Sequence, residues 1–180
     1  MGYPPFEDFA DDGTTPIGYD IDIATEVASR LGLEVNFINT AWDGIFVGID
    51  TNYDCVCSAV TITKERQETT SDELMSDYKS TGTIDVEIVA NEKVTSCFTQ
   101  LTNGEVDAVA VDSTVADGYV AQSPDKYTIA YQDEKEPEQF GIAMGLKNTA
   151  LKSAIDEALA QMEADGFIKE TYDYWFGSAE

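Results

Sequence analysis

Segments with helical spacing alternate along this chain with short segments that are typical of buried strands. Residues 19–31 place apolar side chains on one helical face, and Gly32 follows as a stop signal. Residues 54–60 are small and mostly apolar, which predicts a buried strand. Alternation of this kind predicts an α/β fold in which mainly parallel sheets are flanked by helices.

The same alternation continues to the end of the chain. We expect further helices at residues 42–50, 72–80, 93–102, 113–122, 149–165 and 167–176, and another that begins at Thr63. Short strands are expected at residues 35–37, 84–90, 106–111, 127–131 and 140–144. The stretches 51–58 and 102–111 repeat one order of helix end, turn, aspartate and small strand. This echo favours two similar lobes that each present polar groups at the carboxyl end of a strand, where open α/β sheets bind ligands.

The chain is strongly acidic and contains no histidine. Its 180 residues include 10 Lys and Arg against 35 Asp and Glu, a formal net charge of −25. Such a surface repels phosphate backbones, so nucleic acid is a poor partner. The absence of His excludes a Ser-His-Asp triad, a Cys-His pair and His-ligated zinc. The acids, including Asp20 and Asp22 at a helix start, have no metal-loop spacing and are expected mostly on solvated faces, so neither metal nor cofactor is expected.

The three cysteines, Cys55, Cys57 and Cys97, do not form a disulfide framework, because their number is odd. Cys55 and Cys57 lie two apart in the expected strand and so face the same side. We expect them to be small buried residues; a bridge to Cys97 or a reactive thiol is the alternative.

Neutral and charged donors cluster around the end of the strand at 54–60. Ser58 ends the buried run, Thr61 follows, and Arg66 lies one turn into the helix that Thr63 caps. A guanidinium and hydroxyls near a helix N-terminus suit a carboxylate ligand. The alternative is a simple helix cap with a surface arginine that pairs with one of the many acids.

Asp112 ends the apolar strand at 106–111 and precedes a helix. It is either the N-cap of that helix or a ligand for an ammonium group. Together with Arg66 on the other lobe it would hold the two charges of a zwitterion. Tyr3, in a stiff Pro-rich segment, and Trp42, at a helix start, would offer aromatic surface to the same cleft; packing in the core or at its rim is the alternative. The aromatic cluster at 172–176 is expected to pack.

Several stretches of the chain resemble the extracellular solute-binding proteins of amino-acid ABC transporters, which have the two-lobed type II periplasmic-binding-protein fold. The matches run in the order of the family: YPPFE at 3–7, GYDID at 18–22, WDGI at 42–45, TITKER at 61–66, NGEVDAV at 103–109, and ADGF with WFG within 164–177. Each match is short, but their common order extends over most of the chain.

The resemblance implies roles for individual residues. Tyr3 and Trp42 would flank the ligand side chain. Ser58 would line the pocket, and the backbone of Ala59 would help to hold the carboxylate. Thr61 and Arg66 would bind the α-carboxylate, and Asp112 would bind the α-ammonium group.

The chain departs from the family pattern in two places. The first strand of the family and a segment after Glu68 have no recognisable counterpart. Thr70 matches a hydroxyl that the family adds to the carboxylate site from a Gly-Thr-Thr loop, and is therefore a further candidate.

These observations predict a non-enzymatic, monomeric receptor for a free amino acid. Lobe one would comprise residues 1–68 and 142–180, and lobe two residues 69–141. An ABC transporter permease would read the closed form, outside the cytoplasmic membrane, with or without a lipid anchor. The alternatives are an enzyme on the same fold, such as a cyclohexadienyl or arogenate dehydratase, and the sensor domain of a membrane receptor.

Overall fold

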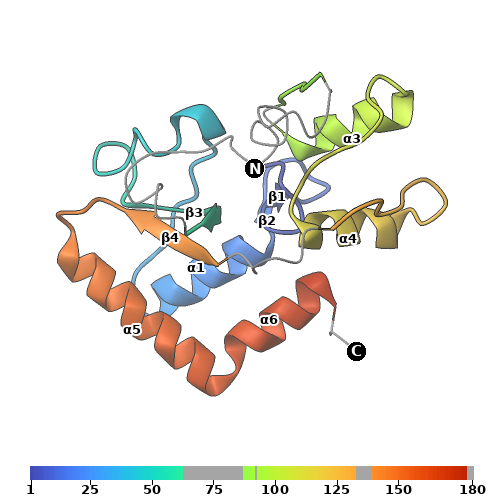
Figure 1. The fold of residues 1–180 in the computed structure, drawn as a ribbon. Coiled ribbons are helices and arrows are strands. Elements are labelled where there is room, and N and C mark those ends of the chain that lie inside the picture. The colour runs from blue at the N-terminus through green and yellow to red at the C-terminus, as the bar shows by residue number, and fades with distance from the viewer. Residues whose placement is uncertain (63–86, 92, 133–138, 178–180) are drawn as a thin grey trace.

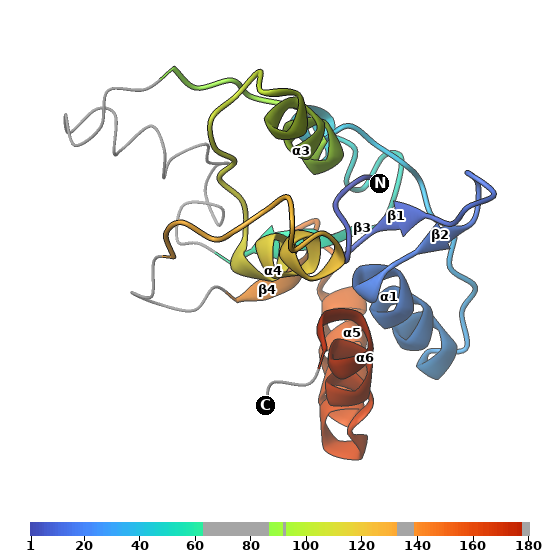
Figure 2. The same ribbon diagram turned by 90° about the vertical axis from the view of Figure 1, so that its right-hand side faces the viewer.

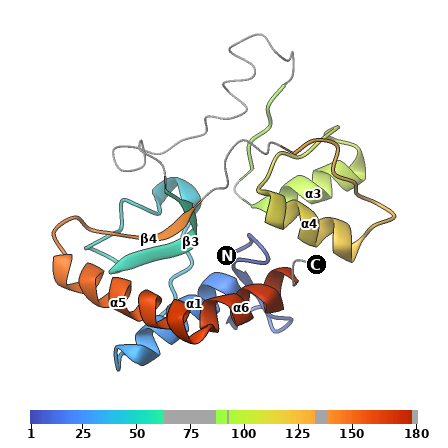
Figure 3. The ribbon, with the colours of Figure 1, turned by 60° about the horizontal axis from the view of Figure 1, so that its bottom comes forward.

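The structure is a computed structural model that describes residues 1–62, 87–91, 93–132 and 139–177. Two groups of elements make up this part of the chain (Figures 1 and 3). The first group contains β1 (Asp8–Phe9), β2 (Pro16–Ile17), α1 (Tyr19–Arg30), the 3-10 helix η1 (Trp42–Gly44), β3 (Cys55–Thr61), β4 (Phe140–Met144), α5 (Thr149–Asp165) and α6 (Phe167–Phe176). The second contains α3 (Val94–Asn103) and α4 (Ser113–Gln122). Figure 2 shows α3 at the opposite end of the molecule from α5 and α6.

The described strands form two antiparallel pairs, β1 with β2 and β3 with β4. The register of the second pair runs from Cys55 opposite Met144 to Thr61 opposite Phe140. The parallel pairing that we expected from βα alternation is therefore wrong for these strands. Consecutive βα units would have imposed parallel neighbours, but the chain leaves β3 for the second group and returns as β4 in the opposite direction.

Helical periodicity predicted the observed helices well, and it predicted the isolated strands badly. The helices expected at 19–31, 93–102, 113–122, 149–165 and 167–176 are α1, α3, α4, α5 and α6. The strands expected at 54–60 and 140–144 are β3 and β4. The segments 35–37, 106–111 and 127–131 are not strands, nor are residues 87–90 of the strand expected at 84–90, of which residues 84–86 lie outside the described part; the helix expected at 42–50 is reduced to η1 and turns. An alternating apolar pattern does not form a strand unless a neighbouring strand is available for hydrogen bonding. Val35, in the segment 35–37, is 39% exposed. The helices expected at 72–80 and from Thr63 lie outside the described residues.

None of the helices described here combines the length and the apolar character needed to cross a membrane.

Two apolar clusters hold the described elements together. The first joins α1 to α5 and contains Ile23, Val27, Ile155, Ala158 and Met162. The second contains Phe6 and Ala59 from the first group of elements together with Val94, Phe98 and Val115 from the second. Because this second cluster draws on both groups, burial of apolar surface favours their contact.

Of the C-terminal aromatic residues, Trp175 and Phe176 pack against the rest of the protein, whereas Tyr172 is 41% and Tyr174 77% exposed, so the packing expected for the whole cluster is wrong for these two tyrosines. The ring centroid of Phe176 lies 5.1 Å from that of Phe6 and 5.3 Å from that of Tyr19. The Trp175 indole donates to Asp22 Oδ2 over 2.7 Å. The end of α6 thus covers both the N-terminal segment and the first turn of α1.

Gly18 lets the N-terminal segment cross the start of α1. The Tyr19 N–H donates to the Pro5 carbonyl over 3.0 Å, and the Asp20 N–H donates to the Phe6 carbonyl over 2.9 Å. These two donors belong to the first helical turn and have no acceptor within the helix. Gly18 itself has a φ of 135°, and a Cβ at this position would lie 2.2 Å from the Phe6 carbonyl oxygen.

Gly18→Ala should therefore destabilise the protein by roughly 3 kcal/mol or more, because it combines an unfavourable backbone conformation with a clash against main chain. Gly32→Ala is the matched control, since Gly32 has a φ of 67° but nothing within 4 Å of an added Cβ. We expect it to cost about 1 kcal/mol. Urea unfolding of both variants measures the difference, and equal losses would contradict the role given to the Phe6 carbonyl.

Candidate functional site

Tyr3 and Asp112, two of the predicted site residues, meet in the structure although 109 positions separate them in the sequence. The Tyr3 hydroxyl donates a hydrogen bond to Asp112 Oδ2. The Tyr3 ring also stacks on Phe6, with centroids 5.8 Å apart. The N-terminus lies between the two groups of elements in Figure 3, so this contact joins the first group to the second.

The side chain of Asp112 does not cap α4. Asp112 occupies the N-cap position, and its backbone carbonyl accepts from Val115 N over 3.1 Å and from Ala116 N over 3.0 Å. Its carboxylate makes no capping hydrogen bond and is instead the acceptor for Tyr3. The sequence left open whether Asp112 caps α4 or binds an ammonium group. Asp112 does occupy the N-cap position, but its carboxylate accepts from Tyr3 and not from the helix.

Ser58 and Ala59 lie in an irregular part of β3. The β3–β4 register shifts between Val56 and Val60, and Ala59 has a φ of 43°. A residue other than glycine with positive φ is uncommon, and a bulge of this kind takes residues out of the ladder. Ser58 and Ala59 lie between the paired residues Val56 and Val60, and the Ser58 hydroxyl and the Ala59 N–H bond to the N-terminal segment and to α1.

Two buried carboxylates accept hydrogen bonds from Ser58 and Ala59. The Ser58 hydroxyl donates to Glu7 Oε1, and the Ala59 N–H donates to Asp20 Oδ2 over 2.5 Å. Glu7 and Asp20 are each only 6% exposed. The Ala59 N–H, which we expected to bind a ligand carboxylate, thus has an acceptor within the protein.

Burial changes the ionisation of both acids. The pKa of Glu7 rises to about 8, mainly because burial removes water from the carboxylate and further because Asp20 is close; the hydrogen bond from Ser58 opposes the rise. The pKa of Asp20 rises to about 6, again through burial, against the hydrogen bond from Ala59. Glu7 is therefore mostly protonated at neutral pH, and Asp20 is mostly ionised.

The other predicted site residues are placed less completely. Trp42 begins η1 and packs edge-on against Phe46, with ring centroids 5.7 Å apart. Thr61 ends β3, half-buried and opposite Phe140. Arg66 and Thr70 lie outside the described residues.

Glu7 and Asp20 are not among the site residues that the sequence predicts. The expectation of a solvated face is wrong for Asp20, which is buried, and for Asp22, which is half-buried under Trp175. The helical spacing contained a signal for Asp20, because it lies three and seven positions before the buried Ile23 and Val27 on the same face. Nothing in the local sequence marks Glu7, whose burial depends on distant segments.

The cysteines are free thiols and half-buried, so the expected full burial is wrong and no bridge to Cys97 forms. Cys57 Sγ lies 3.7 Å from the Asp20 carbonyl oxygen. Burial, together with the charge of Asp20, raises the pKa of this thiol well above its usual value. A thiol of this kind is a poor nucleophile.

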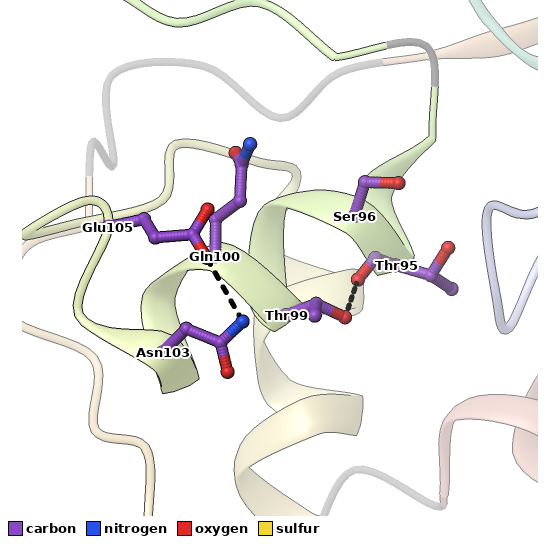
Figure 4. A pocket seen from close by; sticks show the side chains of 6 residues that line it. All are labelled: Thr95, Ser96, Thr99, Gln100, Asn103 and Glu105. Carbon is purple, nitrogen blue, oxygen red and sulfur yellow. Dashed lines mark hydrogen bonds between the residues drawn. The ribbon is translucent and has the colours of Figure 1, made fainter.

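The surface hollow in Figure 4 is not the predicted site. It follows one side of α3 and is lined by polar residues: Thr95, Ser96, Thr99, Gln100, Asn103 and Glu105. Asn103 Nδ2 donates to Glu105 Oε1 over 3.1 Å, and Thr99 Oγ1 donates to the Thr95 carbonyl over 2.8 Å. None of the predicted ligand residues that the structure describes lines it. Across the described residues, no three Cys, Asp or Glu side chains converge as a metal site.

Comparison with known proteins assigns the chain to a family. The profile of the bacterial extracellular solute-binding proteins, family 3, matches residues 1–178. The chain belongs to this family. The ABC transporter arginine-binding protein 1 of Escherichia coli K12 is 26% identical over 213 residues, which cover 97% of this chain and 87% of that protein.

Solved structures agree with the two-lobed periplasmic-binding-protein fold. An ancestral arginine-binding protein bound to glutamine superposes with a TM-score of 0.84 and is 26% identical, covering 98% of this chain and 95% of that one. An ancestral amino acid-binding protein described as a precursor of cyclohexadienyl dehydratase has a TM-score of 0.81 and 25% identity, covering 97% and 92%. The resemblance that the sequence motifs suggested is thereby confirmed, as is the α/β fold class.

The buried acids make folding stability depend on pH. Because the pKa of Glu7 rises from 4.5 to about 8, the folded state holds a proton that the unfolded chain has lost within this range. Stability therefore falls as pH rises from about 4.5 to 8. At about 1.4 kcal/mol per pH unit, Glu7 accounts for a loss of about 2 kcal/mol between pH 6 and 8.

Glu7→Gln should remove this part of the slope, whereas Asp8→Asn, at the neighbouring half-exposed position, should keep it. Denaturant unfolding at pH 6, 7 and 8 measures the slopes. Wild-type stability that is flat over this interval would contradict a raised Glu7 pKa.

Proposed function

We propose that this chain is the substrate-binding protein of an ABC transporter and binds a free amino acid between two lobes. Lobe one would comprise residues 1–68 and 142–180, and lobe two residues 69–141. The observation that carries the proposal is the hydrogen bond between Tyr3 and Asp112, two residues that we assign to different lobes and to the same ligand site. Membership of the family and the arginine- and glutamine-related names of its relatives support the ligand class.

The chemistry follows from the two charges of an amino acid. Arg66 would hold the α-carboxylate with Thr61, Thr70 and Ser58, because a guanidinium offers two parallel donors to a carboxylate. Asp112 would hold the α-ammonium group, and Tyr3 and Trp42 would flank the side chain. The ligand would neutralise one charge on each lobe, so its binding would favour closure of the lobes.

Binding, rather than catalysis, is the function that these residues support best. A dehydratase on this fold would need a general acid near the ligand. Among the described residues Glu7 is the acid with the pKa best suited to that task, but it is buried and hydrogen-bonded to Ser58. We expect no turnover of prephenate or arogenate, and the appearance of product would support the enzyme instead.

The proposal extends to the cellular setting. A monomer outside the cytoplasmic membrane, free or lipid-anchored, would present the closed form to the permease of its transporter. The net charge of −25 would keep such a protein soluble.

Isothermal titration against the twenty L-amino acids at pH 6.5 tests the proposal, and saturable one-to-one binding of at least one is expected. Asp112→Asn should weaken that binding about 100-fold, because a buried ammonium group would lose its charged partner. Asp117→Asn removes the same charge from an exposed position on α4 and should leave affinity unchanged. Failure of all twenty amino acids to bind would overturn the proposal.

Arg66→Ala and Arg66→Lys test the other end of the ligand in the same titration. The alanine variant should bind at least about 100-fold more weakly, and the lysine variant should be intermediate, since it keeps the charge without the paired donors. Unchanged affinity in Arg66→Ala would contradict the assignment of the carboxylate to Arg66.

A further inference from the structure

Only one of the two carboxylate oxygens of the buried Glu7 has a hydrogen-bond partner among the described residues. Its Oε1 accepts from the Ser58 hydroxyl, and its Oε2 is fully buried with no hydrogen-bond partner in the described part of the chain. The backbone carbonyl of Glu7 accepts from Tyr3 N over 2.9 Å, which fixes the segment that carries Tyr3. Glu7 thus contacts both the Tyr3 segment and the Ser58 bulge without being exposed itself.

The groups around Glu7 offer its carboxylate little compensation. The negative charges of Asp20 of α1 and Asp8 of β1 raise the pKa of Glu7, and the charge of Glu7 in turn raises the pKa of the Cys57 thiol of β3. The positive N-terminal amine lowers the pKa of Glu7, but burial outweighs it. No ion pair involving Glu7 is found among the residues described.

We propose that Glu7, in its protonated form, is a positioning residue that prepares Ser58 to receive the carboxylate of the ligand. This inference rests on the proposed amino-acid-binding function. When the proton of Glu7 is on Oε1, the hydrogen bond with Ser58 reverses: the carboxyl group donates to the Ser58 oxygen, and the Ser58 hydroxyl proton is left for the ligand. An ionised Glu7 can only accept, so it would keep that proton and place a negative charge beside the ligand carboxylate.

The proposal makes ligand affinity depend on pH in one direction. Affinity is full while Glu7 is protonated and falls as pH rises through the pKa of Glu7, about 8. At pH 9 roughly a tenth of the molecules keep the proton, so affinity should be about tenfold weaker than at pH 6.5. Ligand binding above pH 8 should also take up a proton from the solvent, by the same linkage.

The experiment starts from the panel of twenty L-amino acids at pH 6.5 and continues with the one that binds wild-type protein most tightly. Its affinity is measured at pH 6.5 and 9, and proton uptake at pH 8.5 is obtained from titrations in two buffers of different ionisation enthalpy. Glu7→Gln keeps the size and a donor but cannot ionise. Asp8→Asn is the matched control, because it removes one negative charge at the neighbouring half-exposed residue, whose charge contributes least to the raised pKa of Glu7.

Wild-type protein and Asp8→Asn should both lose about tenfold in affinity and take up a proton, while Glu7→Gln should change less than threefold and take up less. The ligand ammonium group titrates equally in all three proteins and cancels in the comparison. Ser58→Ala should weaken binding at pH 6.5 and reduce the dependence of affinity on pH. This variant replaces Glu7→Gln as the test if Glu7→Gln does not fold. Equal wild-type affinity at both pH values, or an unaltered profile in Glu7→Gln or Ser58→Ala, overturns the inference. Absence of any binding at pH 6.5 instead overturns the proposed function itself.

Discussion

The described structure depends on the transfer of two carboxylates, Glu7 and Asp20, into the protein interior. Asp20 accepts from the Ala59 N–H and joins α1 to β3, while Glu7 accepts from Ser58 and joins the N-terminal segment to the same strand. Burying such groups is costly unless they are hydrogen-bonded or neutral. Both solutions are used here: Asp20 stays largely ionised with a close donor, and Glu7 is mostly neutral at pH 7.

The irregular backbone of β3 follows from these contacts. A regular ladder would direct the N–H groups of successive residues to neighbouring strands, but the register shift frees Ser58 and Ala59 to reach the two acids. The positive φ of Ala59 costs free energy that the buried hydrogen bond from Ala59 N to Asp20 offsets. The strand therefore contains an irregular polar segment, which is the region that we propose binds the ligand carboxylate.

The contact between Tyr3 and Asp112 bears on how such a protein responds to its ligand. Asp112 is half-buried and already accepts one hydrogen bond, so the ammonium group of the proposed ligand would share the carboxylate with Tyr3 or displace it. Phe6, whose ring stacks on Tyr3, belongs to the apolar cluster that also contains Val94, Phe98 and Val115. The polar contact and the apolar cluster thus lie at the same junction between the two groups of elements.

The sequence by itself determined the helices, the acidity and the family, because helical spacing, caps and short motifs are local properties of the chain. It also singled out Tyr3 and Asp112 for the same site. Only the tertiary structure decided the antiparallel partner of β3, the absence of strands at 106–111 and 127–131, the burial of Glu7 and the acceptor of the Ala59 N–H. Strand pairing and ionisation depend on groups that approach through space from distant parts of the chain, and no local pattern encodes which of 35 acids will lose its water.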